Sequence, residues 1–178
     1  MGDWKKAVAV FKELKFPIDC NRFEEKLAAQ KIICMLQLKG MNLNYPFRLN
    51  IRGSYSKEFT RDYYNYNHEF KNLITDTTLS EDEKATVNAL DSLFKKSPSL
   101  LEIGATYAYL TVNLGKSPIE AFGIVKQEKG FYPDTKIAKG ISKAKEFLFE
   151  PTLEDLDWLK EETGPMQRAS LKSMKEFK

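Results

Sequence analysis

The residue types best suited to chemistry come together in the run Arg52-Gly53-Ser54-Tyr55-Ser56. This run lies where a predicted strand ends and a predicted helix begins. Unpaired N–H groups at a helix start, two hydroxyls and a guanidinium can together hold an anion. Ser54 or Ser56 can instead act simply as the helix cap, with Arg52 at the surface. The sequence leaves both interpretations open, a helix cap and an anion or ligand site.

A second candidate is a line of polar side chains in and just beyond the apolar run at 100–110. Glu102, Thr106, Tyr109 and Asn113 are spaced by four, three and four residues, which places them on one face of a helix. Three interpretations of that face are open: it is the solvent side of an amphipathic helix, a buried polar network or a functional polar site. If it is buried, Glu102 needs a partner, because an unpaired buried carboxylate is costly.

Two basic residues, Arg52 and Lys31, are natural partners for a buried Glu102. Glu102 also stands three residues after Ser99, so the pair could form a capping box at the start of the same helix. In a third interpretation, a buried Glu102 beside a pocket would act as an acid or a base.

Histidine and thiol chemistry have few candidates in this sequence. The chain of 178 residues contains one histidine and two cysteines, too few for a four-ligand Cys/His zinc site or a disulfide framework. His68 lies near a predicted helix end and is interpreted as an exposed or hydrogen-bonded residue. Nothing near Cys20 or Cys34 indicates a lowered thiol pKa. We therefore predict no metal site, no cofactor and no catalytic residue of these types.

Aromatic residues recur at helical spacing after the Gly-Ser turn, at Tyr55, Phe59, Tyr63, Tyr66 and Phe70. A stripe at this spacing is typical of a helix that packs into the core. The alternative is a platform on which unpaired nucleobases stack beside Arg52 and Arg61. Tyr64 lies off the stripe, and we predict that it is exposed.

Basic residues are concentrated in the N-terminal part of the chain. Residues 1–75 contain 13 Lys or Arg and 8 Asp or Glu, although the net charge of the whole chain is only +3. This excess either attracts an acidic partner such as nucleic acid or belongs to an ordinary solvated surface. The nucleic-acid hypothesis requires four side chains to share one face, those of Arg48, Arg52, Lys57 and Arg61.

Helix-start signals dominate the sequence. A Ser, Thr or Asn followed three residues later by an acid resembles a capping box, and this pattern occurs at Asn21/Glu24, Ser80/Glu83, Ser99/Glu102, Ser117/Glu120 and Thr152/Asp155. Together with apolar periodicity, these signals predict helices over about 3–15, 22–39, 55–70, 81–96, 99–114, 117–129, 134–149 and 152–162. The helix at 22–39 is apolar nearly all round, which predicts that it is buried.

A single segment, at about 46–52, alternates with the period of a strand, and the Thr-rich segment at about 73–79 is its possible partner. The predicted fold class is therefore mainly α, a compact multi-helix domain with one small β-hairpin. We predict one domain over residues 1–150 and a C-terminal helical appendage over 151–178. No apolar run approaches the roughly 20 residues that span a membrane, and the first residues lack a signal-peptide pattern. We therefore expect a cytoplasmic protein that does not bind membranes.

Three runs resemble motifs of a known group of proteins. They are Lys-Leu-Ala-Ala-Gln-Lys-Ile-Ile at 26–33, the aromatic element around Tyr-Ser at 47–64, and Leu-Glu-Ile-Gly-Ala-Thr-Tyr-Ala-Tyr-Leu at 101–110. In this order they resemble the prokaryotic YwgA-like proteins and the related Panacea, or SocA-like, domains, although Ser54 stands where that group usually has proline. The resemblance implies a helical fold with a small hairpin, a winged-helix-like N-terminal part, and antitoxin or adaptor roles exercised by protein binding.

Three hypotheses about function follow. The first is a non-enzymatic regulatory or adaptor domain that binds another protein. The second is a winged-helix-like protein that binds nucleic acid through its basic N-terminal part. The third is an enzyme that uses Glu102 as acid or base and Arg52 to hold an anionic substrate. The candidate residues for a ligand or partner are Arg52, Ser54, Tyr55, Ser56, Glu102, Thr106 and Tyr109.

Overall fold

A computed structural model shows how these elements are arranged, and it describes residues 2–51 and 53–149. Residues Met1–Leu148 form one compact unit. Arg52 and the predicted appendage at 151–178, including the predicted helix at 152–162, lie outside the described residues. Within the described ranges, no helix has both the length and the apolar character needed to cross a membrane.

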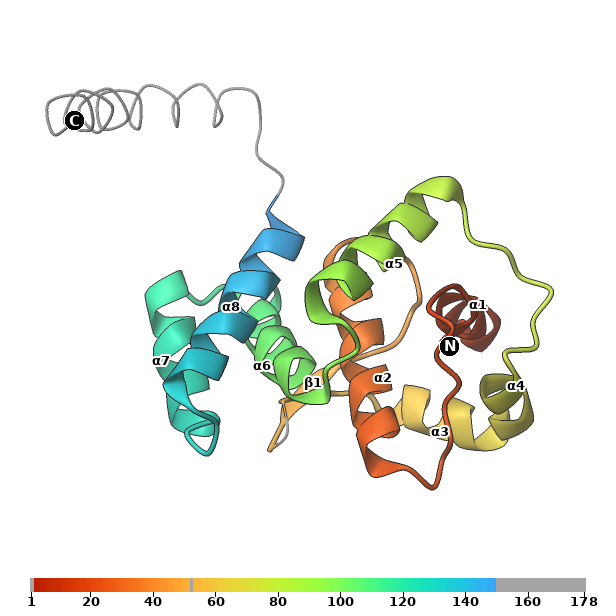
Figure 1. Cartoon of the computed structure of the whole chain (residues 1–178), viewed down its shortest axis with the longest axis horizontal. Helices are drawn as coiled ribbons and strands as arrows, with labels where there is room; N and C mark the ends of the chain where they lie inside the picture. The colour runs from red at the N-terminus through yellow and green to blue at the C-terminus, as the bar shows by residue number, and fades with distance from the viewer. Residues whose placement is uncertain (1, 52, 150–178) are drawn as a thin grey trace, which may run out of the picture. The chain divides into compact units, whose positions relative to one another are not determined.

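The described residues form a mainly helical structure with one small β-hairpin, as the sequence predicted (Figure 1). This part of the chain has eight α-helices, and α6 continues into a short π-helical segment, η1. The elements in chain order are α1 Trp4–Glu13, α2 Phe23–Leu38, β1 Arg48–Asn50, β2 Gly53–Tyr55, α3 Lys57–Asn65, α4 Asn67–Asn72, α5 Glu81–Phe94, α6 Pro98–Ala108, η1 Tyr109–Asn113, α7 Pro118–Glu128 and α8 Asp134–Leu148.

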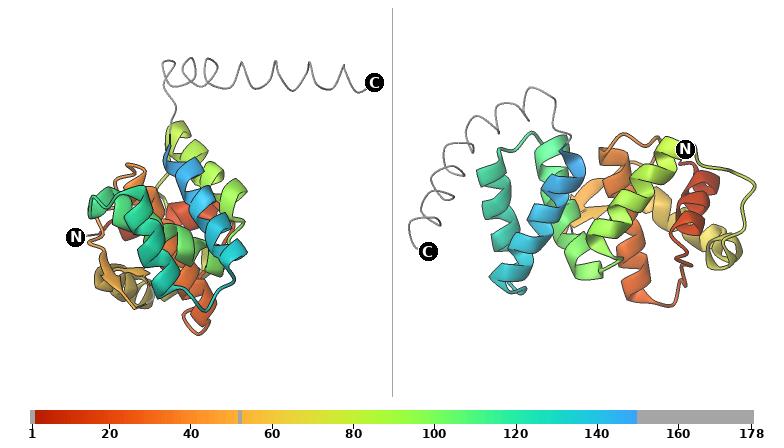
Figure 2. Two further views of the ribbon diagram at one scale, coloured as in Figure 1. Left: turned by 90° about the vertical axis from the view of Figure 1, so that its left-hand side faces the viewer. Right: turned by 45° about the horizontal axis from the view of Figure 1, so that its top comes forward.

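Two buried helices, α2 and α6, pack against each other and organise the remaining elements. Helices α7 and α8 pack on α6, whereas α1 contacts α3, α4 and α5 (Figures 1 and 2). Residues 28–36 of α2 are all buried, which confirms the prediction drawn from its apolar composition. The hairpin strand β2 contacts both α2 and α6, so the hairpin is held by the two most buried helices.

The hairpin is more local than the sequence predicted. Strand β1 pairs antiparallel with β2, with Arg48 opposite Tyr55, Leu49 opposite Ser54 and Asn50 opposite Gly53. The prediction that the segment at 73–79 pairs with the first strand is wrong, because that segment is a loop. Thr75 binds backbone atoms instead of continuing a ladder: its Oγ1 donates to the Lys5 carbonyl at 3.1 Å and accepts from Thr77 N at 3.1 Å.

The predicted helix at 55–70 is two helices that meet at Tyr66. Tyr66 leaves the helical region at φ −111° and ψ 36°, and its ring stacks on Trp4 with centroids 3.9 Å apart. Phe59, Tyr63 and Phe70 are buried, so the core interpretation of the aromatic stripe is confirmed for these residues. Tyr64 is 52% exposed, also as predicted.

The capping boxes at Ser80/Glu83 and Ser117/Glu120 are present with both reciprocal hydrogen bonds. The expected boxes at Asn21/Glu24 and Ser99/Glu102 are wrong. Helix α2 has Arg22 at its N-cap, and α6 begins one residue earlier than expected because Pro98 occupies its first turn after Ser97. The expected box at Thr152/Asp155 lies outside the described residues.

Candidate functional site

Two glutamines of α2 hold both ends of the segment that carries the hairpin. Gln30 accepts from Ser56 N at 3.0 Å and donates to the Ser56 carbonyl at 3.1 Å. Gln37 makes the same pair of bonds with Tyr45, accepting from its N–H at 2.8 Å and donating to its carbonyl at 2.9 Å. The two glutamines are seven residues apart and therefore lie on one face of the helix. Residues 45–56 are thus fixed to α2 at both ends.

Ser56 is the N-cap of α3, which confirms the cap interpretation for this serine. Its hydroxyl accepts from Phe59 N at 3.2 Å, and the residue is fully buried. Gln30 also donates to Thr60 Oγ1 at 2.8 Å. All the polar groups of the Gln30 side chain are therefore engaged with the start of α3.

Lys31 follows Gln30 and carries a buried ammonium beside β2. The residue is 2% exposed, and its Nζ donates to the Ser54 carbonyl at 2.6 Å. Burial lowers the pKa of Lys31 to about 8, because the charged form loses its hydration. Burial likewise raises the pKa of the neighbouring Cys34 thiol to about 11, so this thiol stays protonated at neutral pH.

Gly53 permits the close approach of the hairpin to these side chains. Its φ of +82° is in the left-handed region that favours glycine. A Cβ at this position would overlap Thr106 Oγ1 of α6 and lie 3.6 Å from Lys31 Nζ. The hydroxyl of the adjacent Ser54 is buried and has only the Cys34 thiol as a weak neighbour.

Glu102 is buried and paired, with 3% of the residue exposed. Its Oε1 accepts from Lys129 Nζ at 2.8 Å, and its Oε2 accepts from Tyr132 OH at 3.0 Å. Lys129 is 1% exposed and also donates to the Ile51 carbonyl at 3.2 Å. The expectation that Lys31 pairs with Glu102 is wrong, since Lys31 bonds the hairpin instead. The other expected partner, Arg52, lies outside the described residues.

The rest of the polar line is also largely buried, so the structure supports a buried network and not a solvent face. Thr106 Oγ1 donates to the Glu102 carbonyl at 2.7 Å. Tyr109 OH donates to the Phe47 carbonyl at 2.9 Å, which fixes the segment that leads into β1. Asn113 is exposed, because the π-helical segment η1 changes the helical phase after Ala108.

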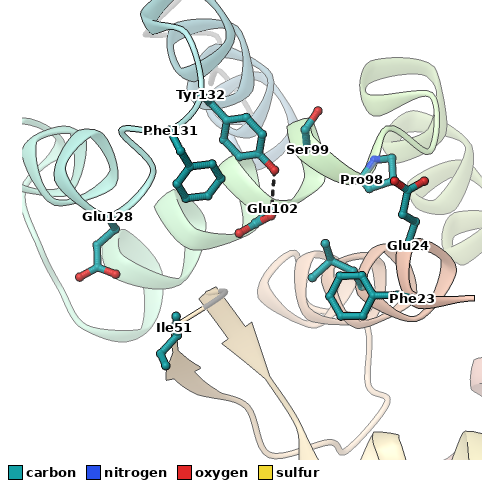
Figure 3. A pocket seen from close by; sticks show the side chains of 10 residues that line it. Phe23, Glu24, Ile51, Pro98, Ser99, Glu102, Glu128, Phe131 and Tyr132 are labelled. Atoms are coloured by element: carbon teal, nitrogen blue, oxygen red, sulfur yellow. Dashed lines mark hydrogen bonds between the residues drawn. The ribbon is translucent and has the colours of Figure 1, made fainter.

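A pocket of about 780 Å³ opens beside Glu102 and is called the acidic pocket (Figure 3). Its side chains come from α2, the hairpin tip, the start of α6 and the end of α7 with the loop that follows it. It is lined by Phe23, Glu24, Leu27, Ile51, Pro98, Ser99, Glu102, Glu128, Phe131 and Tyr132.

A second pocket of about 470 Å³ also has the hairpin-tip residue Ile51 in its lining and is called the lysine pocket. Its side chains come from α2, the hairpin and α3. It shares three residues with the acidic pocket, and none of the described residues in its lining is an aspartate or glutamate. It is lined by Phe23, Lys26, Leu27, Gln30, Lys31, Asn50, Ile51, Gly53, Tyr55, Thr60, Tyr63 and Tyr64.

The structure distributes the predicted site residues over these two pockets. Tyr55 lines the lysine pocket and Glu102 lines the acidic pocket. The other described candidates lie outside both linings: Ser54, Ser56, Thr106 and Tyr109 are buried, and Arg48, Lys57, Arg61 and His68 are exposed.

Sequence reasoning missed Lys129, Tyr132 and the glutamine clamps. Lys129 follows the last turn of α7 and looks like an ordinary solvated helix end, so the sequence carries no sign that Glu102 lies next to it. The seven-residue spacing of Gln30 and Gln37 on an apolar helix is the signal that could have been used, since buried amides require partners.

Comparison of the chain with models of protein families, with curated proteins and with solved structures finds no match. Among the described residues, no group of three or more His, Cys, Asp or Glu is arranged to hold a metal ion. The site is therefore interpreted from its own geometry.

Proposed function

We propose that this protein is a regulatory or adaptor domain that binds a basic segment of another protein in the acidic pocket. The observation that carries the proposal is the set of exposed apolar side chains around this hollow. Ile51 is 85% exposed, Phe131 69% and Phe23 53%. Large apolar and aromatic side chains grouped around a concavity are typical of a protein-binding site.

The charges of the pocket favour a lysine or arginine of the partner. Glu24 and Glu128 are exposed in the lining, and neither makes an ion pair with another described residue. Phe131 and Tyr132 add aromatic surface beside them, and the chain's own Lys129 and Lys136 lie over these two rings, 6.0 and 5.6 Å from the centroids. The attraction for a partner's basic side chain therefore rests on the two glutamates. No lysine or arginine of the described chain lines this pocket. A basic side chain flanked by apolar residues matches this combination.

The geometry of Glu102 supports protein binding over acid–base catalysis. Both of its carboxylate oxygens are already engaged, one by an ammonium and the other by a phenol. The residue is also only 3% exposed, so a substrate has little access to the remaining lone pairs of the carboxylate. The pair with Lys129 holds Ile51 at the hairpin tip, which is a positioning role for the binding surface.

Selection of peptides displayed on phage against the purified chain tests the proposal. We expect enriched peptides with a lysine or arginine next to apolar residues. Reversing two charges with Glu24→Lys and Glu128→Lys should weaken their binding at least about tenfold, measured by fluorescence anisotropy. Glu146→Lys is the matched control, because Glu146 is exposed on α8 and lines neither pocket.

A second pair of variants tests the apolar part of the surface. Phe131→Ala should weaken peptide binding, whereas Val112→Ala should not, although Val112 is similarly apolar and 50% exposed. Enriched peptides that lack a basic residue, or that bind the charge-reversed variant as tightly as the original chain, would contradict the proposal.

A further inference from the structure

The lysine pocket is rich in hydrogen-bond donors and lacks the acceptors that would neutralise them. Lys26 and Lys31 both line it, and no carboxylate from the described part of the chain does. The amide of Gln30, also in the lining, is already used by Ser56 and Thr60. The polar groups left for a ligand are therefore mainly donors.

Lys31 is the central donor because its ammonium is buried but only partly coordinated. An ammonium carries three N–H groups, and the described residues offer Lys31 Nζ a single acceptor, the neutral Ser54 carbonyl. Among the described residues, no carboxylate lies within ion-pair distance of Lys31, and Glu102 is paired with Lys129 instead. A buried charge without a counter-charge is costly, and its lowered pKa of about 8 reflects that cost.

One tyrosine hydroxyl in the lining, that of Tyr64, keeps its proton available for a ligand. Tyr64 OH accepts from Lys26 Nζ at 3.1 Å. Tyr55 OH lies 2.9 Å from Thr60 Oγ1, whose single proton is directed to the Ser56 carbonyl at 3.0 Å, so the Tyr55 proton is used by Thr60. The pocket therefore offers one buried cation, one peripheral cation and one hydroxyl donor.

We propose that the lysine pocket binds a carboxylate, with Lys31 as its charged partner and the hydroxyl of Tyr64 as a further donor. One buried ammonium is neutralised by one negative charge, which a carboxylate supplies; a phosphate dianion would bring a second charge into the same buried position. The site itself is independent of the proposed function.

The source of the carboxylate follows from the proposed function. The two pockets share Phe23, Leu27 and Ile51, so one bound segment can reach both. A partner segment that places a basic side chain in the acidic pocket would place an acidic group beside Lys31. That group is an aspartate or glutamate side chain or a C-terminal carboxylate.

Benzoate is the first probe, because it combines a carboxylate with a ring that fits an aromatic pocket. We expect benzoate to raise the pKa of Lys31 by at least one unit, measured by NMR on protein with ¹³C-labelled lysine. Benzamide, its neutral analogue, should leave the pKa unchanged. Lys31→Met should reduce benzoate affinity at least tenfold, and Lys139→Met, on the exposed face of α8, should not.

Three results would overturn the inference: no response of Lys31 to benzoate, equal benzoate affinity in Lys31→Met, or tighter binding of phenyl phosphate or single-stranded DNA than of benzoate. The last result would indicate a phosphate site. If Lys31→Met does not fold, the pKa of Lys31 in the unmodified chain with and without benzoate still decides the question.

Peptides that bind the acidic pocket separate the two sources and the two proposals. If the ligand is a C-terminal carboxylate, a peptide without internal acids should lose affinity when its C-terminus is converted to an amide. If the ligand is a side chain, replacing the internal aspartate or glutamate of the peptide should lower its affinity. Benzoate binding without any peptide binding would support the carboxylate site and contradict the proposed function. Peptide binding that is unchanged in Lys31→Met would support the proposed function and contradict the peptide as the source of the carboxylate.

Discussion

At the scale of single residues, the two buried lysines of the site face different energetic situations. Lys129 has a carboxylate at 2.8 Å, so the cost of desolvation is offset by a direct charge pair. Among the described residues, Lys31 has only the Ser54 carbonyl oxygen as an acceptor, so most of its desolvation cost is not offset. Residues that persist in such unfavourable positions often serve binding or catalysis.

Replacing Lys31 with methionine should stabilise the protein below pH 8. The pKa of Lys31 falls from 10.5 when exposed to about 8 in the folded chain, which corresponds to a penalty of about 3 kcal/mol while both forms are charged. Between pH 8 and 10.5 the unfolded chain binds the extra proton, so the penalty shrinks as the pH rises. Lys31→Met should therefore gain about 3 kcal/mol at pH 7 and much less at pH 10, measured by urea denaturation.

The comparison between variant and original chain isolates Lys31 from the other groups that titrate in this range. Cys34 on α2, Glu102 on α6 and Lys129 after α7 are the charged or titratable groups that act on it, and all three are common to both chains. Lys139→Met is the control for loss of an exposed lysine. A stability difference that stays constant from pH 7 to pH 10 would contradict the lowered pKa of Lys31.

At the scale of elements, the hairpin depends on Gly53 for two reasons, its positive φ and its lack of a side chain next to α6. Experiment can separate these two effects. Gly40 has a φ of +107° and open space around it, whereas Gly53 has a φ of +82° and Thr106 against it. Gly40→Ala should cost about 1 kcal/mol through backbone strain alone. Gly53→Ala should cost at least about 2 kcal/mol more, because the Cβ also overlaps Thr106 Oγ1. Thermal or urea denaturation measures both.

A double variant checks this explanation. Thr106→Ala removes the hydroxyl that the new Cβ would meet, so it should recover part of the cost of Gly53→Ala. If Gly53→Ala and Gly40→Ala lower the free energy of unfolding by the same amount, the close approach of the hairpin to α6 is not the reason that residue 53 is glycine.

The elements were predictable where the signal is local. Ser80/Glu83 and Ser117/Glu120 mark two helix starts because a capping box needs only neighbouring residues. The alternation at 46–52 correctly indicated a strand. The predicted partner of that strand, the Thr-rich segment at 73–79, was wrong, because β1 pairs with β2 across a tight turn. Asn21 and Ser99 show that the same four-residue pattern also occurs where other residues cap the helix.

At the scale of the whole described unit, the site depends on contacts that no local pattern contains. Glu102 was one of the predicted site residues and does line a pocket, but its partner Lys129 is 27 positions away, directly after α7. Tyr55 was another, and it lines a different pocket from Glu102. The sequence therefore indicated residues of interest, whereas packing decides which groups meet.

The nucleic-acid hypothesis makes a different prediction for the whole molecule, because its residues lie outside both pockets. Arg48, Lys57 and Arg61 are exposed and line neither. Replacing all three with alanine should leave the affinity for selected peptides within about twofold, measured by anisotropy at 150 mM salt. Binding of single-stranded DNA that falls steeply with salt and is lost in this variant would favour the nucleic-acid hypothesis instead.

The anchoring of the hairpin has a consequence for how its specificity could change over evolution. Gln30, Lys31 and Lys129 hold the segment through backbone atoms of Ile51, Ser54 and Ser56, not through its side chains. The side chains at the tip can therefore be exchanged without loss of these bonds. A library varied only at Leu49 and Ile51, both exposed, should yield folded proteins with new binding preferences on an unchanged framework.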